Sequence, residues 1–148
     1  MRVIDATRRS GVAVAPDQTV EQVAQLMEQA NVGAVAVIDR DELIGIVTDR
    51  DLVRRALARR LAPDARIDGV MTSPAVTIDA GADLHDAFAL FNEHAIRRLA
   101  IVDDGSFVGM IAVDDLLIDV ANDLAAIARP VTAEVFFGHH NAAVPAAT

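Results

Sequence analysis

The chain of 148 residues contains no cysteine, no tryptophan and no tyrosine. Without cysteine there is no disulfide framework, no thiolate nucleophile and no cysteine-ligated zinc site. Five phenylalanines offer little aromatic surface on which exposed nucleic-acid bases could stack. The formal net charge of -9 also argues against nonspecific nucleic-acid binding, which depends on arginine and lysine contacts to phosphates. The composition therefore predicts no nucleic-acid partner.

Long apolar runs are missing as well. No stretch approaches the ~18 residues of a membrane span, and the start Met1–Asp5 lacks the apolar core of a signal peptide. With 53% hydrophobic and 24% charged residues, the composition is that of a folded protein rather than a disordered one. We expect one compact, cytoplasmic module without a membrane partner.

The sequence repeats itself after 64 positions, without a gap, as the pairs Asp39/Asp103, Gly45/Gly109, Asp51/Asp115, Val12/Val76 and Leu52/Leu116 show. Such a period indicates two copies of one small supersecondary unit, each too small to bury its own apolar face. The copies should therefore pack against each other, and equivalent loops should face one another across a cleft.

Each copy has the pattern strand, helix, strand, strand, helix. In the first copy, Thr19 and Gln22 form a capping-box pattern at a helix start, and apolar residues follow at helical spacing. The expected elements are a strand at 12–14, a helix from 19, strands at 34–38 and 43–47, and a helix at 49–61. In the second copy they are a strand at 76–78, a helix at 83–93, strands at 99–102 and 107–111, and a helix from 114.

These elements predict an α+β fold of two pseudo-symmetric repeats packed through their sheets. We place repeat 1 at 1–61, a linker at 62–73, repeat 2 with an extended final helix at 74–128, and a C-terminal extension at 129–148. Pro130 should stop the final helix, since proline lacks the amide that a helix interior needs. Residues 131–137 should then be extended, with Phe136 and Phe137 packed on the domain or on a second subunit.

The junction of a strand and a helix at Gly45–Asp51 carries the strongest local signal. Thr48 and Asp51 have capping-box spacing and could simply satisfy the free amides of the helix start. Alternatively, the helix start and the Thr48 hydroxyl could bind a phosphate while the Asp51 carboxylate accepts from two ribose hydroxyls. The second copy has Ala112 in place of the threonine but keeps the acid, which favours a role beyond capping.

The order of elements, the stretch Gly45–Asp51 and the segment His94–Asp103 together resemble a tandem CBS-domain pair, or Bateman module, over roughly residues 3 to 122. The resemblance implies an adenosine ligand, such as AMP, ADP, ATP or S-adenosylmethionine, in a cleft between the repeats. Asp51 would hold the ribose and Thr48 would lie near ribose or phosphate. Pro74, Ala75 and Val76 would flank the adenine, and Arg97 and Arg98 would face the phosphates.

A second cleft would use Asp115 with Ser10, Gly11 and Val12. Gly33 and Ala34 occupy the positions that match Arg97 and Arg98, so phosphate binding there lacks its cations. We therefore predict one principal site and a weaker second cleft.

The remaining polar and charged residues are weaker candidates for a functional site. His139 and His140 lack a third metal ligand, His85 and His94 suit a helix surface, and the arginines between Arg54 and Arg60 suit a solvated helix face. We predict no metal and no required cofactor.

The sequence thus predicts a regulatory module without catalysis, which the resemblance further implies is a homodimer that acts on an unidentified protein. The alternatives are a structural or interaction module with vestigial clefts, and a nucleotide hydrolase that uses Asp51 and Asp115 with a divalent ion. Two single carboxylates in separate clefts would be a poor metal site for hydrolysis.

Overall fold

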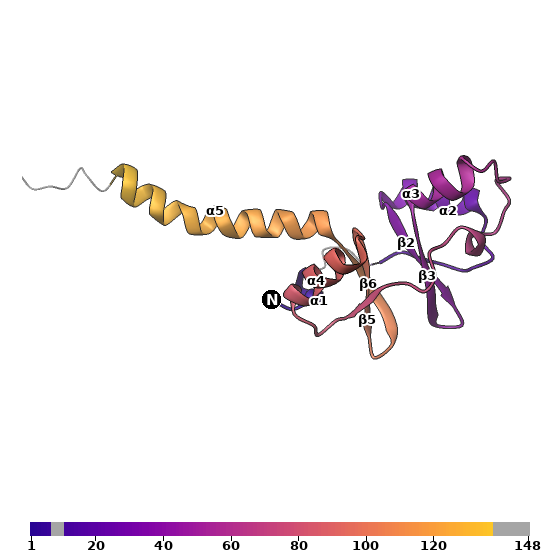
Figure 1. Cartoon of the computed structure of the whole chain (residues 1–148), viewed down its shortest axis with the longest axis horizontal. Helices are drawn as coiled ribbons and strands as arrows, with labels where there is room; N and C mark the ends of the chain where they lie inside the picture. Colours follow the sequence, from indigo (N-terminus) through magenta and orange to yellow (C-terminus); the bar gives the residue numbers. More distant parts are fainter. Residues whose placement is uncertain (7–10, 138–148) are drawn as a thin grey trace, which may run out of the picture. The chain divides into compact units, whose positions relative to one another are not determined.

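The computed structural model describes residues 1–6 and 11–137, with side chains up to residue 132. The chain forms two units, Met1–Val113 and Asp114–Thr148. The first unit holds two three-stranded sheets (Figure 1). In one sheet, β1 (Ala13–Val14) pairs in parallel with β2 (Ala34–Asp39), which pairs antiparallel with β3 (Glu42–Thr48). In the other, β4 (Thr77–Asp79), β5 (Arg98–Asp103) and β6 (Ser106–Ala112) repeat this arrangement.

The 64-residue period is kept in the strand register. Val37 pairs with Gly45 before the register shifts at Ile38, and Ile101 pairs with Gly109 before the same shift at Val102. Both hairpins turn through two residues with positive φ, Arg40 and Asp41 in the first and Asp104 and Gly105 in the second. Positive φ at both central positions is the type I′ geometry that joins twisted antiparallel strands. The predicted α+β fold of two repeats is confirmed.

The helices begin where the caps predict. Helix α2 (Val20–Ala30) starts after Thr19, whose side chain accepts from the Gln22 amide, and the Gln22 side chain accepts from Thr19 N. Helix α4 (Leu84–His94) starts after Asp83 with the corresponding box to Asp86. The helix predicted at 49–61 ends earlier, at Leu57. It consists of α3 (Asp49–Asp51) followed directly by the π-helical η1 (Leu52–Leu57).

Each repeat receives a short segment from outside its own strands. Helix α1 (Val3–Ala6) packs against α4 of repeat 2, and Val3 N donates to Ala82 O at 2.9 Å. The 3-10 turn η2 (Ile67–Gly69), 64 residues later, lies against repeat 1, where Ile67 N donates to Gln18 O at 2.8 Å. The two repeats therefore exchange equivalent segments, which the sequence pattern did not reveal.

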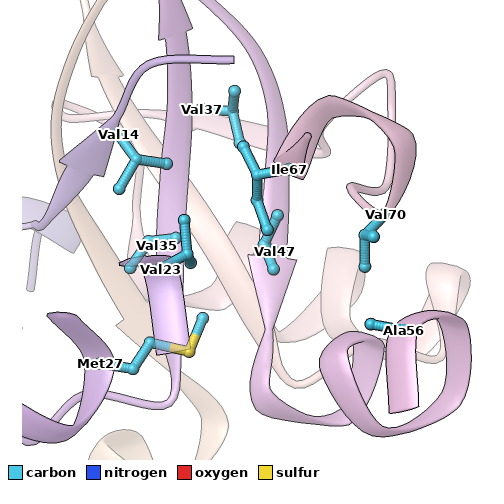
Figure 2. Packing of buried hydrophobic residues seen from close by; sticks show 9 residues of the cluster. All are labelled: Val14, Val23, Met27, Val35, Val37, Val47, Ala56, Ile67 and Val70. Atoms are coloured by element: carbon cyan, nitrogen blue, oxygen red, sulfur yellow. The ribbon is translucent and has the colours of Figure 1, made fainter. Parts of the chain in front are cut away.

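The core of repeat 1 shows this exchange. Figure 2 draws Val35, Val37 and Val47 of the sheet beside Ile67 and Val70 of the linker. All five side chains are fully buried. The linker is thus part of the hydrophobic core rather than a spacer.

The two sheets meet through β3 and β6. The contact is built on a small apolar cluster of Ala34, Ile46 and Ala100, with Leu43, Ala75, Phe107 and Met110 packed around it. Residues 71–76, here the crossing segment, run past β3, where Ile46 and Thr72 exchange both backbone hydrogen bonds at 3.0 and 2.8 Å. Gly45 permits this approach, since a Cβ there would lie 2.7 Å from Met71 Sδ and 2.9 Å from Thr72 O.

Helix α5 (Val113–Phe137) corrects one prediction. It has 25 residues and continues through Pro130, so residues 131–137 are helical rather than extended. Residues 121–132 are all exposed, so water can solvate the carbonyl that the missing proline amide leaves unpaired. The Thr132 hydroxyl also donates to Ala128 O at 2.8 Å. The predicted packing of Phe136 and Phe137 lies outside the described side chains.

Candidate functional site

The turn that leads from β3 into α3 holds two of the predicted site residues in a closed capping box. Asp51 N donates to Thr48 Oγ1 at 3.1 Å, and Thr48 N donates to Asp51 Oδ2 at 3.0 Å. The other carboxylate oxygen, Oδ1, lies 4.0 Å from Arg55 Nε, and the Asp51 side chain is 15% exposed. The capping interpretation is therefore correct as far as it goes, and the box also fixes the direction of the Asp51 carboxylate.

The backbone amides of this turn are already in use. Asp49 N donates to Gly33 O at 3.0 Å, and Arg50 N donates to Asp49 Oδ1 at 2.8 Å. Together with the two bonds of the capping box, these occupy the amides of residues 48 to 51. A phosphate would therefore need donors other than these amides, which the sequence had offered as candidates.

A cation from repeat 2 lies beside the same turn. A Cβ on Gly33 would be 3.2 Å from Arg98 Nη2 and also 3.2 Å from Asp49 Oδ2. The Arg98 guanidinium, which belongs to β5, thus reaches the start of α3 in repeat 1. Gly33 is the position that matches Arg97 in the repeat, and its missing side chain leaves room for this contact.

The crossing segment meets the same region through the apolar cluster at the sheet contact. Ala34 pairs with Thr48 across the β2–β3 hairpin, and Ala75 packs against the cluster that contains Ala34. Ala100, two residues after Arg98, belongs to that cluster and donates its amide to Val76 O at 3.3 Å. The structure thus brings Thr48, Ala75, Val76 and Arg98 to one small region between the repeats.

Two predicted residues of this site are more exposed. Pro74 is exposed and follows Ser73 through a cis peptide bond. The Arg97 side chain is exposed, and its carbonyl accepts from Val113 N at 3.0 Å. This bond repeats the one from Asp49 N to Gly33 O, 64 residues earlier.

The residues of the predicted second cleft lie in different parts of the chain. Gly11 and Val12 are half-buried at the start of β1, and Val12 O accepts from Ala36 N at 2.9 Å. Ser10 lies outside the described residues, and Asp115 belongs to α5 in the second unit. The second cleft stays a prediction.

Sequence reasoning missed Asp49 and Arg55. Asp49 had been passed over for Asp51, although a glycine at the Arg97-equivalent position was a signal that a partner side chain could come close there. Arg55 is exposed, as predicted for a solvated helix face, but the sequence did not reveal that its Nη1 also donates to Val70 O and Met71 O at 3.3 and 3.1 Å. Arg55 thereby ties η1 to the crossing segment.

The histidines form no metal site in the part of the chain that the structure describes, since no three His, Asp or Glu side chains gather there. His85 and His94 are exposed on α4. His139 and His140 lie outside the described residues. Among the helices described, none is both long and apolar enough to cross a membrane.

The 64-residue repeat and the fold agree with a known family that the chain matches. The sequence profile of the CBS domain matches residues 3–58 and again residues 67–122, which are also 64 positions apart. The chain belongs to the CBS domain family. Proteins of this kind, made of a CBS pair, are regulatory modules.

Known relatives of this CBS pair include proteins of bacteria and archaea. The CBS domain-containing protein YhcV of Bacillus subtilis is 37% identical over 117 residues, which covers 79% of this chain and 84% of YhcV. A CBS domain protein of Pyrobaculum aerophilum solved in complex with AMP has a TM-score of 0.75 and 25% identity, covering 82% of this chain and 99% of that one. Hypoxic Response Protein I, solved with two coordinated zinc ions, has a TM-score of 0.70 and 28% identity, covering 79% and 97%.

Proposed function

We propose that this CBS pair binds an adenine nucleotide or a related adenosyl ligand between its repeats and acts as a sensor without chemistry of its own. The observation that carries the proposal is the position of Arg98 of repeat 2, since its Nη2 and Asp49 Oδ2 at the start of α3 would each lie 3.2 Å from a Cβ on Gly33. A cation from one repeat beside a hydroxyl and a fixed carboxylate of the other suits a ligand with both a phosphate and a ribose. The related protein crystallised with AMP supports this ligand class.

Each group has a defined role in this proposal. Asp51 Oδ2 accepts from the Thr48 amide, so Oδ1, which lies 4.0 Å from Arg55 Nε, is the oxygen that would accept from ribose hydroxyls. Arg98 and Arg97 supply the charged donors for phosphate, because the amides of the α3 turn are engaged within the protein. Ala75 and Val76 provide the apolar wall for adenine, with Pro74 at its edge.

The ligand would act by stabilising one arrangement of the two repeats. Because contacts come from both sides of the β3–β6 contact, the bound and free proteins would differ in how tightly the repeats are held together. AMP, ADP, ATP and S-adenosylmethionine share the adenosine that Asp51 and the crossing segment would recognise. The regulated protein would bind differently to the two arrangements of the repeats.

Isothermal titration calorimetry with AMP tests the proposal. Arg98→Ala should weaken binding about 10- to 100-fold, the range for the loss of one charge-assisted hydrogen bond. Asp51→Asn should also weaken it, while an amide oxygen can still accept from Thr48 N and keep the cap. Arg59→Ala, on an exposed arginine of the same repeat, should leave binding unchanged.

The stoichiometry of the same titration tests the predicted asymmetry. One principal site per chain is expected, because Gly33 and Ala34 replace the arginines in the second cleft. Two sites of equal affinity for AMP would contradict this. If AMP, ADP, ATP and S-adenosylmethionine all fail to bind, the adenosine-sensor proposal itself is wrong.

We also propose that two CBS pairs associate through their repeat helices. Val53 and Leu57 lie four residues apart on η1 and are 56% and 76% exposed, and Leu61, after the helix ends, is 42% exposed. Apolar side chains at this spacing share one helix face and favour burial against a partner. Sedimentation equilibrium should show a homodimer that Leu57→Glu weakens.

A further inference from the structure

Helix α5 carries a second apolar stripe that lies outside the proposed ligand site. Leu117, Val120, Leu124, Ile127 and Val131 follow one another at alternating intervals of three and four residues. This interval places them on one face, as in the seam of a coiled coil. They are 62%, 38%, 62%, 68% and 57% exposed, so the residues that the structure describes leave these apolar side chains open to solvent.

The C-terminal half of this stripe belongs to a helical stretch that is exposed on every side. Every residue from Ala121 to Thr132 is exposed, and Pro130 removes one backbone hydrogen bond from the same stretch. Helices in proteins owe most of their stability to packing of an apolar face rather than to intrinsic propensity. An exposed apolar seam on such a helix therefore calls for a partner helix.

We propose that this partner is α5 of a second copy of the chain, packed antiparallel along the seam. The charges of the helix select the orientation. Asp114, Asp115, Asp119 and Asp123 all lie in the first half, whereas the charged residues of the stretch 124–137 are Arg129 and Glu134, whose charges cancel. A parallel pair would place the acid-rich halves side by side, and an antiparallel pair separates them and opposes the two helix dipoles.

The spacing also defines a register. When Leu117 faces the second copy's Ile127, the step of three to Val120 matches the step of three from Ile127 back to Leu124. The step of four from Leu117 back to Val113 likewise matches the step from Ile127 to Val131. All apolar positions of the seam then meet apolar positions, and the midpoint of the pair along the helix axis falls at the level of residue 122.

Sedimentation equilibrium of the full chain tests the seam. The double variant Leu124→Glu/Ile127→Glu should raise the dimer dissociation constant at least 100-fold, because it buries four unpaired carboxylates per pair. Asn122→Glu, exposed on another face of the same helix, is the matched control and should change it less than threefold. Since these side chains are exposed in the chain itself, the variants should fold, which circular dichroism checks.

This inference deepens the proposed homodimer, and Leu57→Glu separates the two. If the seam variant remains dimeric while Leu57→Glu is monomeric, the dimer stands and the α5 seam is wrong. A monomeric wild-type chain overturns both. AMP binding by the seam variant is measured alongside, so that loss of the sensor function is not mistaken for loss of the seam.

Cysteine cross-linking tests the orientation, and the natural absence of cysteine makes the result unambiguous. Positions 117 and 127 lie about 15 Å apart along one helix, too far for a disulfide within it. The double variant Leu117→Cys/Ile127→Cys should form disulfide-linked dimers, whereas Leu117→Cys alone should not. Cross-linking of Leu117→Cys alone indicates a parallel pair and overturns the antiparallel arrangement, as does the absence of any cross-link in the double variant.

Discussion

Arg98 of repeat 2 and Asp49 of repeat 1 meet beside Gly33, where Nη2 and Oδ2 would each lie 3.2 Å from a Cβ on that glycine. Gly33 O also accepts from Asp49 N, so the glycine is tied to the turn that it faces. The two charges belong to different repeats, and the absence of a side chain on Gly33 leaves room for both.

Gly33→Ala should therefore affect ligand binding more than stability. The new methyl group needs only a few tenths of an ångström from the ends of two flexible side chains, so the free energy of unfolding should change by less than about 1 kcal/mol. Displacing Arg98 should weaken AMP binding by about fivefold, which corresponds to ~1 kcal/mol. Gly81→Ala is the matched control, since its Cβ would be 3.2 Å from a carboxylate oxygen of Asp79. Equal effects of both substitutions on AMP affinity would contradict the argument.

The capping boxes of Thr19 and Thr48 have the same geometry and differ in their location. Thr48→Ala and Thr19→Ala should each cost about 0.5–2 kcal/mol in urea unfolding, because each leaves a helix-start amide without its acceptor. Only Thr48→Ala should also weaken AMP binding, since only that box orients a predicted ligand residue. Thr48→Ser should restore both properties. A parallel loss of affinity in Thr19→Ala would show that general stability explains the effect.

The exchanged segments, α1 and η2, should each stabilise the repeat on which they pack. Val3 is fully buried on repeat 2, and Ile67 is fully buried in the core of repeat 1. Val3→Ala should remove about 1–2 kcal/mol of burial and accelerate amide hydrogen exchange in α4 more than in α2. Ile67→Val should do the opposite, at about 0.5–1.5 kcal/mol. Amide hydrogen exchange measured by mass spectrometry checks both variants. If each substitution accelerates it in α2 and α4 in the reverse order, the two segments do not support the repeats on which they pack.

Much of the fold could be predicted because its signals are local. The capping box at Thr19, the hairpin turn at Gly105 and the period of 64 residues depend on neighbours in sequence or on direct comparison of the copies. The segment exchange could not be predicted, because the sequence indicates that Val3 and Ile67 are buried but not which repeat buries them. Pro130 was misread because a helix-breaking tendency of about 3 kcal/mol can be outweighed by the rest of a 25-residue helix.

The candidate site likewise has a part that the sequence predicts from local patterns and a part that it does not. Thr48 and Asp51 form a motif within four residues, so their geometry was foreseen. The approach of Arg98 to Asp49 joins residues 49 positions apart, and no local pattern encodes it. Whether these groups bind a nucleotide depends on chemistry that the titrations above measure.

Gly45 controls how closely the crossing segment approaches β3. Gly45→Ala should destabilise the protein by about 1–3 kcal/mol, because its methyl group would meet Met71 Sδ and the Thr72 carbonyl, and the latter belongs to a backbone pairing. Gly69→Ala is the control, since a Cβ there meets nothing within 4 Å. Thermal unfolding should separate the two variants by several degrees. Identical melting temperatures would mean that the crossing segment moves aside without cost.

The ion pair of the linker gives a pH dependence with a defined sign. Arg66 Nη2 lies 2.8 Å from Asp68 Oδ2, and hydrogen bonding to that guanidinium holds the pKa of Asp68 below its ordinary value. The stabilisation is therefore complete above the unfolded pKa of about 4 and is lost as pH falls through the lower folded pKa. Asp68→Asn should cost less than about 1 kcal/mol at pH 7, because the pair is partly exposed, and the cost should shrink in 1 M salt.

The difference between wild type and Asp68→Asn in urea unfolding should shrink as the pH falls below the unfolded pKa of about 4, and it should disappear once the carboxyl is protonated in the folded state as well. Asp64→Asn, on an exposed aspartate of the same linker, is the control for the loss of one negative charge from an acidic chain. A chain of net charge -9 gains from losing any carboxylate through reduced self-repulsion, so Asp64→Asn should be neutral or slightly stabilising. If Asp68→Asn behaves like Asp64→Asn at pH 7, the ion pair does not contribute to holding the linker on repeat 1.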